Sequence, residues 1–399
     1  MKNEWQTRTL DDVCEFVGGG TPSKAVDRYW RGDIPWVSPK DMKFDTVSDS
    51  IDHISKEAID GSATSLIPKN AVLMVVRSGI LARTIPIATT GRPLAINQDL
   101  KALCPSREIE TRFLYHLLSS KMDLLLSMVS RGATVHRLVT DQIRALEVAL
   151  PPLPEQNRIV GILDEAFAGI ATAKANAEMN LQNARALFES YLQSVFARAW
   201  RTSELVTLSD LASDITDGDH MPPPKSATGV PFITIGNIVK ETRDIDFTNT
   251  FTVPHAYFKA LKPYKKPKKG DVLYTVTGSF GIPVILRANL EFCFQRHIGL
   301  VRPKPETNSS WLYYLLLSPQ VFKQANDGAT GTAQRTVSLK LLRSYEVPRV
   351  SSEQQQAVVA KLDALSAETQ RLASAYERKL AALEALKKSL LHQAFTGQL

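Results

Sequence analysis

Two stretches of the chain carry hydrophobic residues at helical spacing. In the first, apolar positions recur three or four residues apart from Ile159 to Ile170 and, after an alanine-rich middle, from Leu181 to Val195. In the second, the apolar positions between Leu362 and Leu390 alternate mostly by three and four. This spacing lines up apolar side chains on one helix face, and over many turns it is typical of a coiled coil. The pattern predicts two long helical spacers, at residues 151–201 and 349–399.

Signals at the ends of these stretches support the prediction. Pro154 suits the first turn of the first helix. Ser351 and Gln354 have the spacing of a capping box, and Gly397 is a typical stop after the last apolar position. A helix of about 44 residues is roughly 65 Å long. Because neither helix can bury its stripe alone, we expect the two to pack as an antiparallel coiled coil with pseudo-twofold symmetry.

The remaining segments, residues 1–150 and 202–348, have a different pattern. Short β-like runs, such as residues 71–76 and 272–276, are separated by Gly, Pro, Asn and Asp. The clearest helical stretches lie near residues 111–129 and 310–324. Each segment is therefore predicted to be a compact α+β domain.

The second half of the chain restates the first at an offset of about 200 residues. The matches run in order along the chain: Thr9-Leu10 and Asp12 with Thr207-Leu208 and Asp210, Pro35-Trp36-Val37-Ser38 with Pro231-Phe232-Ile233-Thr234, Gly132-Ala133-Thr134 with Gly328-Ala329-Thr330, Arg137 with Arg335, and Phe196 with Phe395. An ordered series of this kind indicates a tandem duplication. The predicted fold class is α+β, a tandem duplication of two α+β domains, each followed by a long helix.

Composition and charge narrow the class of protein. The 399 residues are 44% hydrophobic and 22% charged, which allows each half its own core. A net charge of +7 and a pI near 9.2 favour a polyanionic partner such as nucleic acid. Cys14, Cys104 and Cys293 are far apart and form no CxxC pair, which favours reduced thiols. With no secretory leader and no apolar run long enough for a bilayer, we expect a cytoplasmic protein without a membrane partner.

The motifs of common catalytic sites are missing from the sequence. The glycine cluster Gly18–Lys24 lacks the spacing of a phosphate-binding loop, and there is no HExxH pair. Met221–Pro224 lacks both the acid or amide and the aromatic residue that amino-methyltransferases use to hold a flipped base. The chain is therefore expected to have no catalytic residue, cofactor site or metal site of its own.

Several segments resemble those of Type I restriction-modification specificity subunits. The resemblance lies in Gly19-Gly20-Thr21-Pro22-Ser23, Ile34-Pro35-Trp36-Val37, Leu153-Pro154-Glu155-Gln156 at the domain–helix junction, and the C-terminal segment 386–399. It covers essentially the whole chain. The second domain departs from it at the start, where Asp217-Gly218-Asp219-His220 replaces the glycine-threonine-proline turn.

The resemblance implies a function and a set of partners. Each domain would read one half of an asymmetric, bipartite sequence in double-stranded DNA. The helices would set the gap between the half-sites and dock two methyltransferase (modification) subunits. Those subunits would bring S-adenosylmethionine for adenine methylation, and motor-nuclease (restriction) subunits would bring ATP and Mg.

Base discrimination in the major groove needs donors and acceptors such as Arg, Lys, Asn and Gln, and loops after strands carry these residue types. In the first domain the candidates are Thr21, Ser23, Lys24, Lys40, Arg77, Ser78, Arg83, Gln98, Thr134, His136 and Arg137. In the second domain they are Lys225, Asn237, Lys240, Thr277, Ser279, Gln295, Arg296, His297, Thr330, Gln334 and Arg335. Matched positions differ in type, as in Arg77 against Thr277 and Gln98 against Arg296, which two unlike half-sites require.

Other interpretations of these features stay open. The lysines at 262, 265, 266, 268 and 269 either hold phosphates or form a solvated face. Trp36, Phe232, Trp311 and Tyr313 fit a core better than base stacking. Two rival functions are a self-contained DNA methyltransferase or nuclease, and a coiled-coil scaffold without sequence readout.

Overall fold

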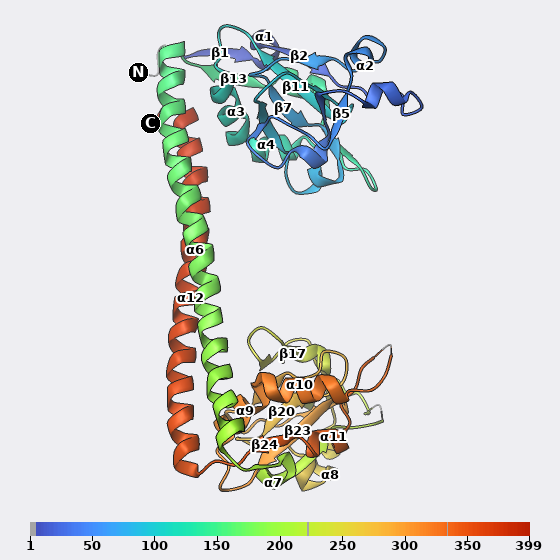
Figure 1. Ribbon diagram of the computed structural model, residues 1–399, viewed down its shortest axis with the longest axis vertical. Helices are drawn as coiled ribbons and strands as arrows, with labels where there is room; N and C mark the ends of the chain where they lie inside the picture. Colours follow the sequence, from blue (N-terminus) through green and yellow to red (C-terminus); the bar gives the residue numbers. More distant parts are fainter. Residues whose placement is uncertain (1–4, 222, 333) are drawn as a thin grey trace. The chain divides into compact units, whose positions relative to one another are not determined.

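The computed structural model describes residues 5–221, 223–332 and 334–399. The chain forms two compact units, Met1–Glu178 with Arg378–Leu399, and Met179–Glu377. Each unit contains one α+β domain together with part of each long helix (Figure 1). The boundary between units therefore crosses both helices, whereas the four predicted segments end where the helices begin and end.

The domain of the first unit is built on two sheets. A five-stranded sheet has the order β2-β11-β7-β9-β4, with β2 Cys14–Gly18, β11 Leu100–Pro105, β7 Val72–Val75, β9 Ile87–Thr90 and β4 Thr46–Val47. A four-stranded sheet has the order β5-β3-β10-β6, with β5 Asp52–Ile54, β3 Ile34–Val37, β10 Leu94–Ile96 and β6 Leu66–Ile67. Two pairs complete it, β1 Gln6–Thr9 with β13 Glu147–Leu150, and β8 Arg77–Ser78 with β12 His136–Arg137. The helices are α1 Leu10–Val13, α2 Lys56–Asp60, α3 Thr111–Ser120, α4 Met122–Ser127 and α5 Thr140–Arg144.

The domain of the second unit repeats this plan. One sheet has the order β15-β23-β20-β21, with β15 Ala212–Asp217, β23 Ile298–Pro303, β20 Val272–Thr275 and β21 Pro283–Ile285. The other has the order β19-β16-β22, with β19 Phe251–Val253, β16 Val230–Ile233 and β22 Cys293–Phe294. Two pairs are β14 Leu205–Thr207 with β24 Glu346–Pro348, and β17 Ile238–Val239 with β18 Asp244–Ile245. The helices are α7 Leu208–Leu211, α8 His255–Ala260, α9 Ser309–Leu317, α10 Pro319–Gly328 and α11 Leu339–Arg343.

Both predicted domain helices are divided in two. The first becomes α3 and α4, and the second becomes α9 and α10. The second break falls at Ser318-Pro319, because proline has no backbone N–H to continue the hydrogen-bond ladder of α9. The buried Ser318 side chain instead accepts a hydrogen bond from the backbone N–H of Val321 and caps α10.

The two long helices are α6 Leu153–Thr202, of 50 residues, and α12 Ser352–Phe395, of 44 residues. The predicted capping box is present, since the N–H of Gln354 donates to Ser351 Oγ and the N–H of Ser351 donates to Gln354 Oε1. The predicted stop at Gly397 is also correct, because its φ of +69° is a left-handed conformation that suits glycine.

Within each unit the two long helices run antiparallel. In the first unit Arg158 donates to the backbone carbonyl of Leu399 at 2.9 Å, and Lys174 pairs with Glu384 at 2.7 Å. In the second unit Arg185 pairs with Glu377 at 2.9 Å. The seam is apolar in both, as shown by the fully buried Leu163 and Leu362. These exposed ion pairs add little stability compared with the apolar seam.

A buried glutamine joins each domain to the helix that follows it. The Gln156 side chain donates to the carbonyls of Glu108 and Pro151 and accepts the N–H of Glu110, all within 2.9 Å. Gln355 repeats this arrangement, as it accepts the N–H of Asn308 and donates to the carbonyls of two residues, 306 and 350. Gln156 is fully buried, and its three bonds satisfy backbone groups of the junction, of which the Pro151 carbonyl is bonded in a buried position.

An aspartate on each long helix makes a second junction. In the first unit Asp164 bonds Arg112 Nη2 at 2.5 Å and His116 Nε2 at 2.8 Å. In the second unit Tyr314, at the position that matches His116, donates to Asp363 at 2.5 Å. Burial tends to raise the pKa of Asp164, but the hydrogen bonds from Arg112 and His116 outweigh burial and lower the pKa. Both units therefore have a hydrogen-bonded aspartate at this junction, but its partners are arginine and histidine in the first unit and tyrosine in the second.

The histidine makes the first junction sensitive to pH. Burial lowers the pKa of His116 below its ordinary value, although the hydrogen bond to Asp164 acts in the opposite direction. Because the unfolded chain then binds a proton more readily than the folded chain, we expect the free energy of unfolding to fall as the pH drops below about 6.5. Urea unfolding at pH 7.5 and 5.5 should show a smaller loss for His116→Tyr than for the wild type. An exposed control, His392→Gln, should keep the wild-type loss, and an unchanged response in His116→Tyr would contradict the prediction.

Candidate nucleic-acid interface

A short two-stranded ribbon, β8 with β12, stands apart from the main sheets of the first domain. Arg77 lies directly opposite Arg137, and Ser78 opposite His136. The ribbon is held to the sheet because Leu138 N–H donates to the carbonyl of Val76 at 2.8 Å. Both arginines are exposed, so the rigid sheet presents two cationic side chains at one edge of the domain.

The same ribbon occurs in the second domain, with different side chains. Thr277 lies opposite Thr336, and Thr330 bridges Thr336 as Ser130 bridges Arg137. Thr336 Oγ1 donates weakly to Thr277 Oγ1 at 3.4 Å. The place of the arginine pair is therefore taken by two threonines that contact each other.

This ribbon corrects the predicted register of the repeat. Arg137 corresponds to Thr336 and not to Arg335, because both bridge the matching strand and the matching loop residue. Gly132 corresponds to Gly331 rather than Gly328, since a Cβ on either would lie 2.4 Å from the carbonyl three residues later. The Gly-Ala-Thr match in the sequence was misleading because the glycine that is structurally equivalent to Gly132 lies three residues after Gly328.

A glycine turn brings the loop after β2 against the end of β10. A Cβ on Gly19 would lie 2.1 Å from the Asn97 carbonyl oxygen, so only glycine permits this approach. Thr21 Oγ1 then donates to Gln98 Oε1 at 2.5 Å. Gly218 permits the same close approach in the second domain, where a Cβ would lie 1.9 Å from the Phe294 carbonyl oxygen. The second domain thus keeps the turn despite its different sequence.

The ribbon lines a depression of about 400 Å³ in the first domain, together with Gln98, Lys101 and residues 138–141. Its polar lining is Arg77, Gln98, Lys101, Arg137, Thr140 and Asp141, so three cationic side chains are present with one carboxylate. Lys101 was missed in the sequence, although a lysine inside an otherwise apolar strand was the available signal. Arg77 Nε is 3.7 Å from Asp99 Oδ1, and Arg137 has no ion-pair partner among the described residues. The depression therefore offers several donors to an acceptor-rich ligand.

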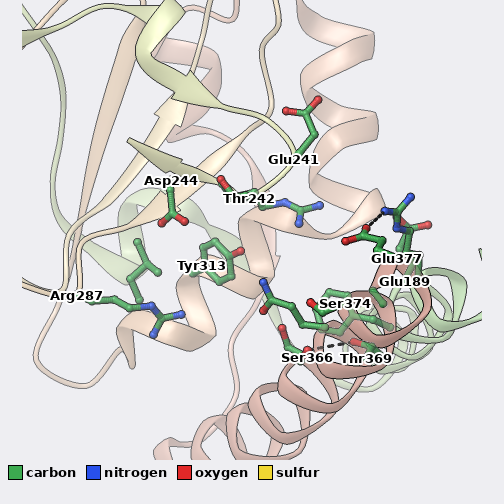
Figure 2. Close-up of a pocket in the computed structure, with 16 residues that line it drawn as sticks. Glu189, Glu241, Thr242, Asp244, Arg287, Tyr313, Ser366, Thr369, Ser374 and Glu377 are labelled. Atoms are coloured by element: carbon green, nitrogen blue, oxygen red, sulfur yellow. Dashed lines mark hydrogen bonds and ion pairs between the residues drawn. The ribbon is translucent and has the colours of Figure 1, made fainter. Parts of the chain in front are cut away.

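The second unit has a larger groove, of about 620 Å³, between its domain and its part of the long helices. Figure 2 shows Thr242, Asp244 and Tyr313 from the domain facing Ser366 and Thr369 of α12. Its charged lining comprises Arg185, Arg243, Arg287, Glu189, Glu241, Asp244 and Glu377. Three arginines against four carboxylates give no cationic surplus, so this groove lacks the surface that a phosphate backbone needs.

Comparison with known proteins places these features in a family. A family model for the Type I restriction modification DNA specificity domain matches residues 2–180 and again 202–380. The chain belongs to the Type I restriction-modification DNA specificity family. The two matches are the two specificity domains, each with the first part of the helix that follows it.

Two curated relatives and one solved structure illustrate the similarity. The EcoR124I/EcoR124II specificity subunit of Escherichia coli is 40% identical over 41% of this chain and 40% of its own length. The MjaIX specificity subunit of Methanocaldococcus jannaschii is 27% identical over 55% of this chain and 50% of its own length. The chain thus spans half or less of these two relatives. A solved structure from work on complex assembly and conformational transition of the type I R-M system shares the fold, with a TM-score of 0.76, 20% identity and coverage of 100% of this chain and 99% of that one.

Most candidate residues of the first specificity domain gather around the ribbon and the glycine turn. Thr21, Gln98, Arg77 and Arg137 lie there, and the ribbon also carries Ser78 and His136. Ser23 and Lys24 follow the turn as exposed residues, while Thr134 and Arg83 lie in the loops next to the ribbon. Lys40 is bound instead in an ion pair with Asp52 at 2.7 Å, whose hydrogen bond raises the pKa of the lysine.

The candidates of the second specificity domain differ in exposure and in whether they are already bound within the protein. Arg296 is exposed at the place of Gln98, between Gln295 and His297, while Gln334 is exposed in the loop before the ribbon strand. Arg335 lies opposite Gly278, next to Ser279, and is bound to Asn326. Lys225 and Lys240 are exposed, with the ammonium of Lys225 5.0 Å from the Phe251 ring. Thr277 is 6% exposed, and Thr330 contributes its backbone to the ribbon.

Asn237 does not belong with the DNA-binding candidates. Its side-chain oxygen accepts the N–H of Thr234, and its amide donates to the carbonyls of Asp246 and Asn249. Asp41 makes the same cap on Ser38 in the first domain. Asn237 is only 5% exposed, so its amide serves the fold and has no free edge for a base.

The surroundings of the aromatic residues, the lysine run and the cysteines answer part of what the sequence left open. Trp36, Phe232 and Trp311 are buried in the core, as expected. Within the lysine run, Lys265 and Lys266 donate to backbone carbonyls of their own domain. All three cysteines are free, and burial raises the pKa of Cys14 to about 12.

Two further properties concern only the described part of the chain. No group of three His, Cys, Asp or Glu side chains there is placed to hold a metal ion. None of the helices in those residue ranges has the length and apolar character to cross a membrane.

Proposed function

We propose that this chain is the DNA-specificity subunit of a Type I restriction-modification complex and reads a bipartite site, one half per domain. The observation that carries the proposal is the contrast between shared scaffold and unlike side chains. The ribbon and the glycine turn recur in both domains, yet Arg77 and Arg137 give way to Thr277 and Thr336. A duplicated scaffold whose matching positions carry different side chains suits two different base sequences.

The physical chemistry of DNA supports a shared scaffold with different side chains at matching positions. Contacts to phosphates give affinity and register but carry no sequence information, whereas donors and acceptors at base edges discriminate. The net charge of +7 favours the first kind of contact. The exposed Arg, Gln and Thr side chains at the ribbon and turn supply the second kind.

The long helices suit a spacing and docking role. Within each unit they pack on one another and are fixed to the domain by Gln156 or Gln355 and by Asp164 or Asp363. A rigid junction of this kind holds a domain at a set place on its helices. We propose that two methyltransferase subunits dock on the remaining helix surface and bring S-adenosylmethionine.

In this proposal the chain is non-catalytic and the chemistry resides in its partners. Motor-nuclease subunits would bring ATP and Mg for cleavage, in a cytoplasmic complex on double-stranded DNA. The chain's own contribution is to select the site.

The test is methylome sequencing of a host that expresses this chain with its cognate methyltransferase subunit, against a host lacking this chain. We expect a new methyladenine motif of two unlike parts with a fixed gap. Exchange of residues 1–150 for another first domain should change one part and leave the other part and the gap intact. No new motif from an assembled complex would leave only a scaffold role, and binding of S-adenosylmethionine by the isolated chain in calorimetry would favour a self-contained methyltransferase.

A further inference from the structure

We propose that Arg77 and Arg137 are specificity-determining residues that bind guanine edges in the half-site of the first domain. The inference rests on the proposed function and deepens it by assigning a base to named side chains. It also predicts that the second domain reads its half-site with residues outside its ribbon, because this ribbon carries threonines at the two positions.

The first argument is the cost of the arginine pair. Arg77 and Arg137 are directly opposite on antiparallel strands, where like charges destabilise the pairing. Asp99 is 3.7 Å from Arg77, beyond a good hydrogen bond, so the partial neutralisation it offers is weak. Two cations held side by side at the rim of a depression are suited to a ligand rich in acceptors.

The second argument is shape. The major groove of B-DNA admits a two-stranded β-ribbon, and guanine presents the acceptors N7 and O6 there. The guanidinium group reaches both acceptors with two parallel donors. Gln98 and Lys101 line the same depression as the two arginines, so neighbouring base edges and phosphates would also find donors.

The third argument separates bases from phosphates. The two domains would bind the same DNA backbone, so phosphate contacts at matching places call for similar chemistry. Base contacts must differ where the half-sites differ. The backbone bridges of the ribbon are kept in both domains while the opposed side chains change from arginine to threonine, which is the pattern of base contacts.

The second domain provides a contrast at the neighbouring loop. Thr277 is nearly buried and contacts Thr336, so the ribbon offers few free donors. Arg296 is exposed at the place that Gln98 holds in the first domain, next to the same glycine turn. An exposed arginine thus lies on the ribbon in the first domain and at the turn in the second, while Arg335 beside the second ribbon is bound to Asn326.

The test uses the complete chain with its methyltransferase partner and the variants Arg77→Lys, Arg137→Lys, Arg77→Thr and Arg137→Thr. Lysine keeps the positive charge but loses the bidentate fork, so it separates a guanine contact from a phosphate contact. Arg107→Thr is the matched control, because this exposed arginine lies beyond the opposite end of β11 from Gln98. Thermal melting and complex assembly are measured for every variant.

We expect each lysine variant to relax one guanine of the first half-site in the methylome, with the second half-site and the gap unchanged. In binding to oligonucleotides carrying each base in turn, discrimination at that position should fall roughly 5- to 150-fold. The proposal is overturned if the lysine variants keep full discrimination, or if the threonine variants weaken binding equally on all sequences and reduce only its salt dependence. If the wild-type complex yields no bipartite motif, the proposed function itself fails.

Discussion

Replacement of Gln156 by alanine is expected to lower the free energy of unfolding of the first unit by about 3–5 kcal/mol, because the buried glutamine makes three hydrogen bonds to buried or part-buried backbone groups and all three are lost. The penalty comes from the groups left behind rather than from the amide itself. Gln156→Leu fills a similar volume but provides no donor or acceptor, so we expect it to destabilise by a comparable amount. The glutamine is thus needed for its hydrogen bonds and not for its size.

Urea unfolding gives the total effect, and hydrogen exchange gives its location. The N–H of Glu110 donates to Gln156 at 2.8 Å, so its protection from exchange should fall in the variant. Gln355→Ala should produce the same response in the second unit at Asn308. Gln182→Ala, at an exposed position of the same helix, should change stability by less than about 0.5 kcal/mol. A Gln156 variant as stable as the Gln182 variant would refute the assigned role.

Phe196→Ala is expected to lower the free energy of unfolding of the second unit by about 3–5 kcal/mol, the usual range for truncation of a buried aromatic side chain. Phe196 is fully buried, and its ring centroid is 4.9 Å from that of Trp311 in α9. The substitution opens a cavity between the long helix and the domain. Because Trp311 loses its neighbour, its fluorescence should change together with the unfolding midpoint.

Phe395 provides the matched comparison. It is the repeat partner of Phe196 and contacts Phe113 at 5.2 Å, but it is only partly buried. Phe395→Ala should therefore destabilise the first unit less than Phe196→Ala destabilises the second. Equal losses would show that burial of the ring does not set the size of the effect.

Local signals in the sequence were reliable where the chain makes its own contacts. The capping box at Ser351, the proline in the first turn of α6 and the stop at Gly397 are short-range features, and all three occur as predicted. The duplication was also visible, and Thr9 with Asp12 and Thr207 with Asp210 form the same cap. The expected helix length of about 44 residues fits α12, whereas α6 has 50 residues and continues to Thr202 because no proline or glycine follows Phe196 in it.

Contacts between distant residues were harder to predict. The polar type of Asn237 suggested a base reader, but its place opposite three backbone groups makes it a cap. The match of Arg137 to Arg335 failed by one residue, since strand pairing and not sequence similarity fixes which side chains are equivalent. Lys101 was missed because only folding brings it beside Arg77 and Arg137.

The sequence by itself determined the tandem repeat, the α+β class, the long helices and the family resemblance, because periodicity, capping and repetition are properties of neighbouring residues. Only the tertiary structure decided which polar side chains are free to meet DNA. That choice depends on burial and on partners more than 50 residues away, such as Arg137 for Arg77 and Gln98 for Thr21. A polar side chain has the same donors wherever it lies in the fold. Its surroundings decide whether those donors are already bound within the protein or remain available to DNA.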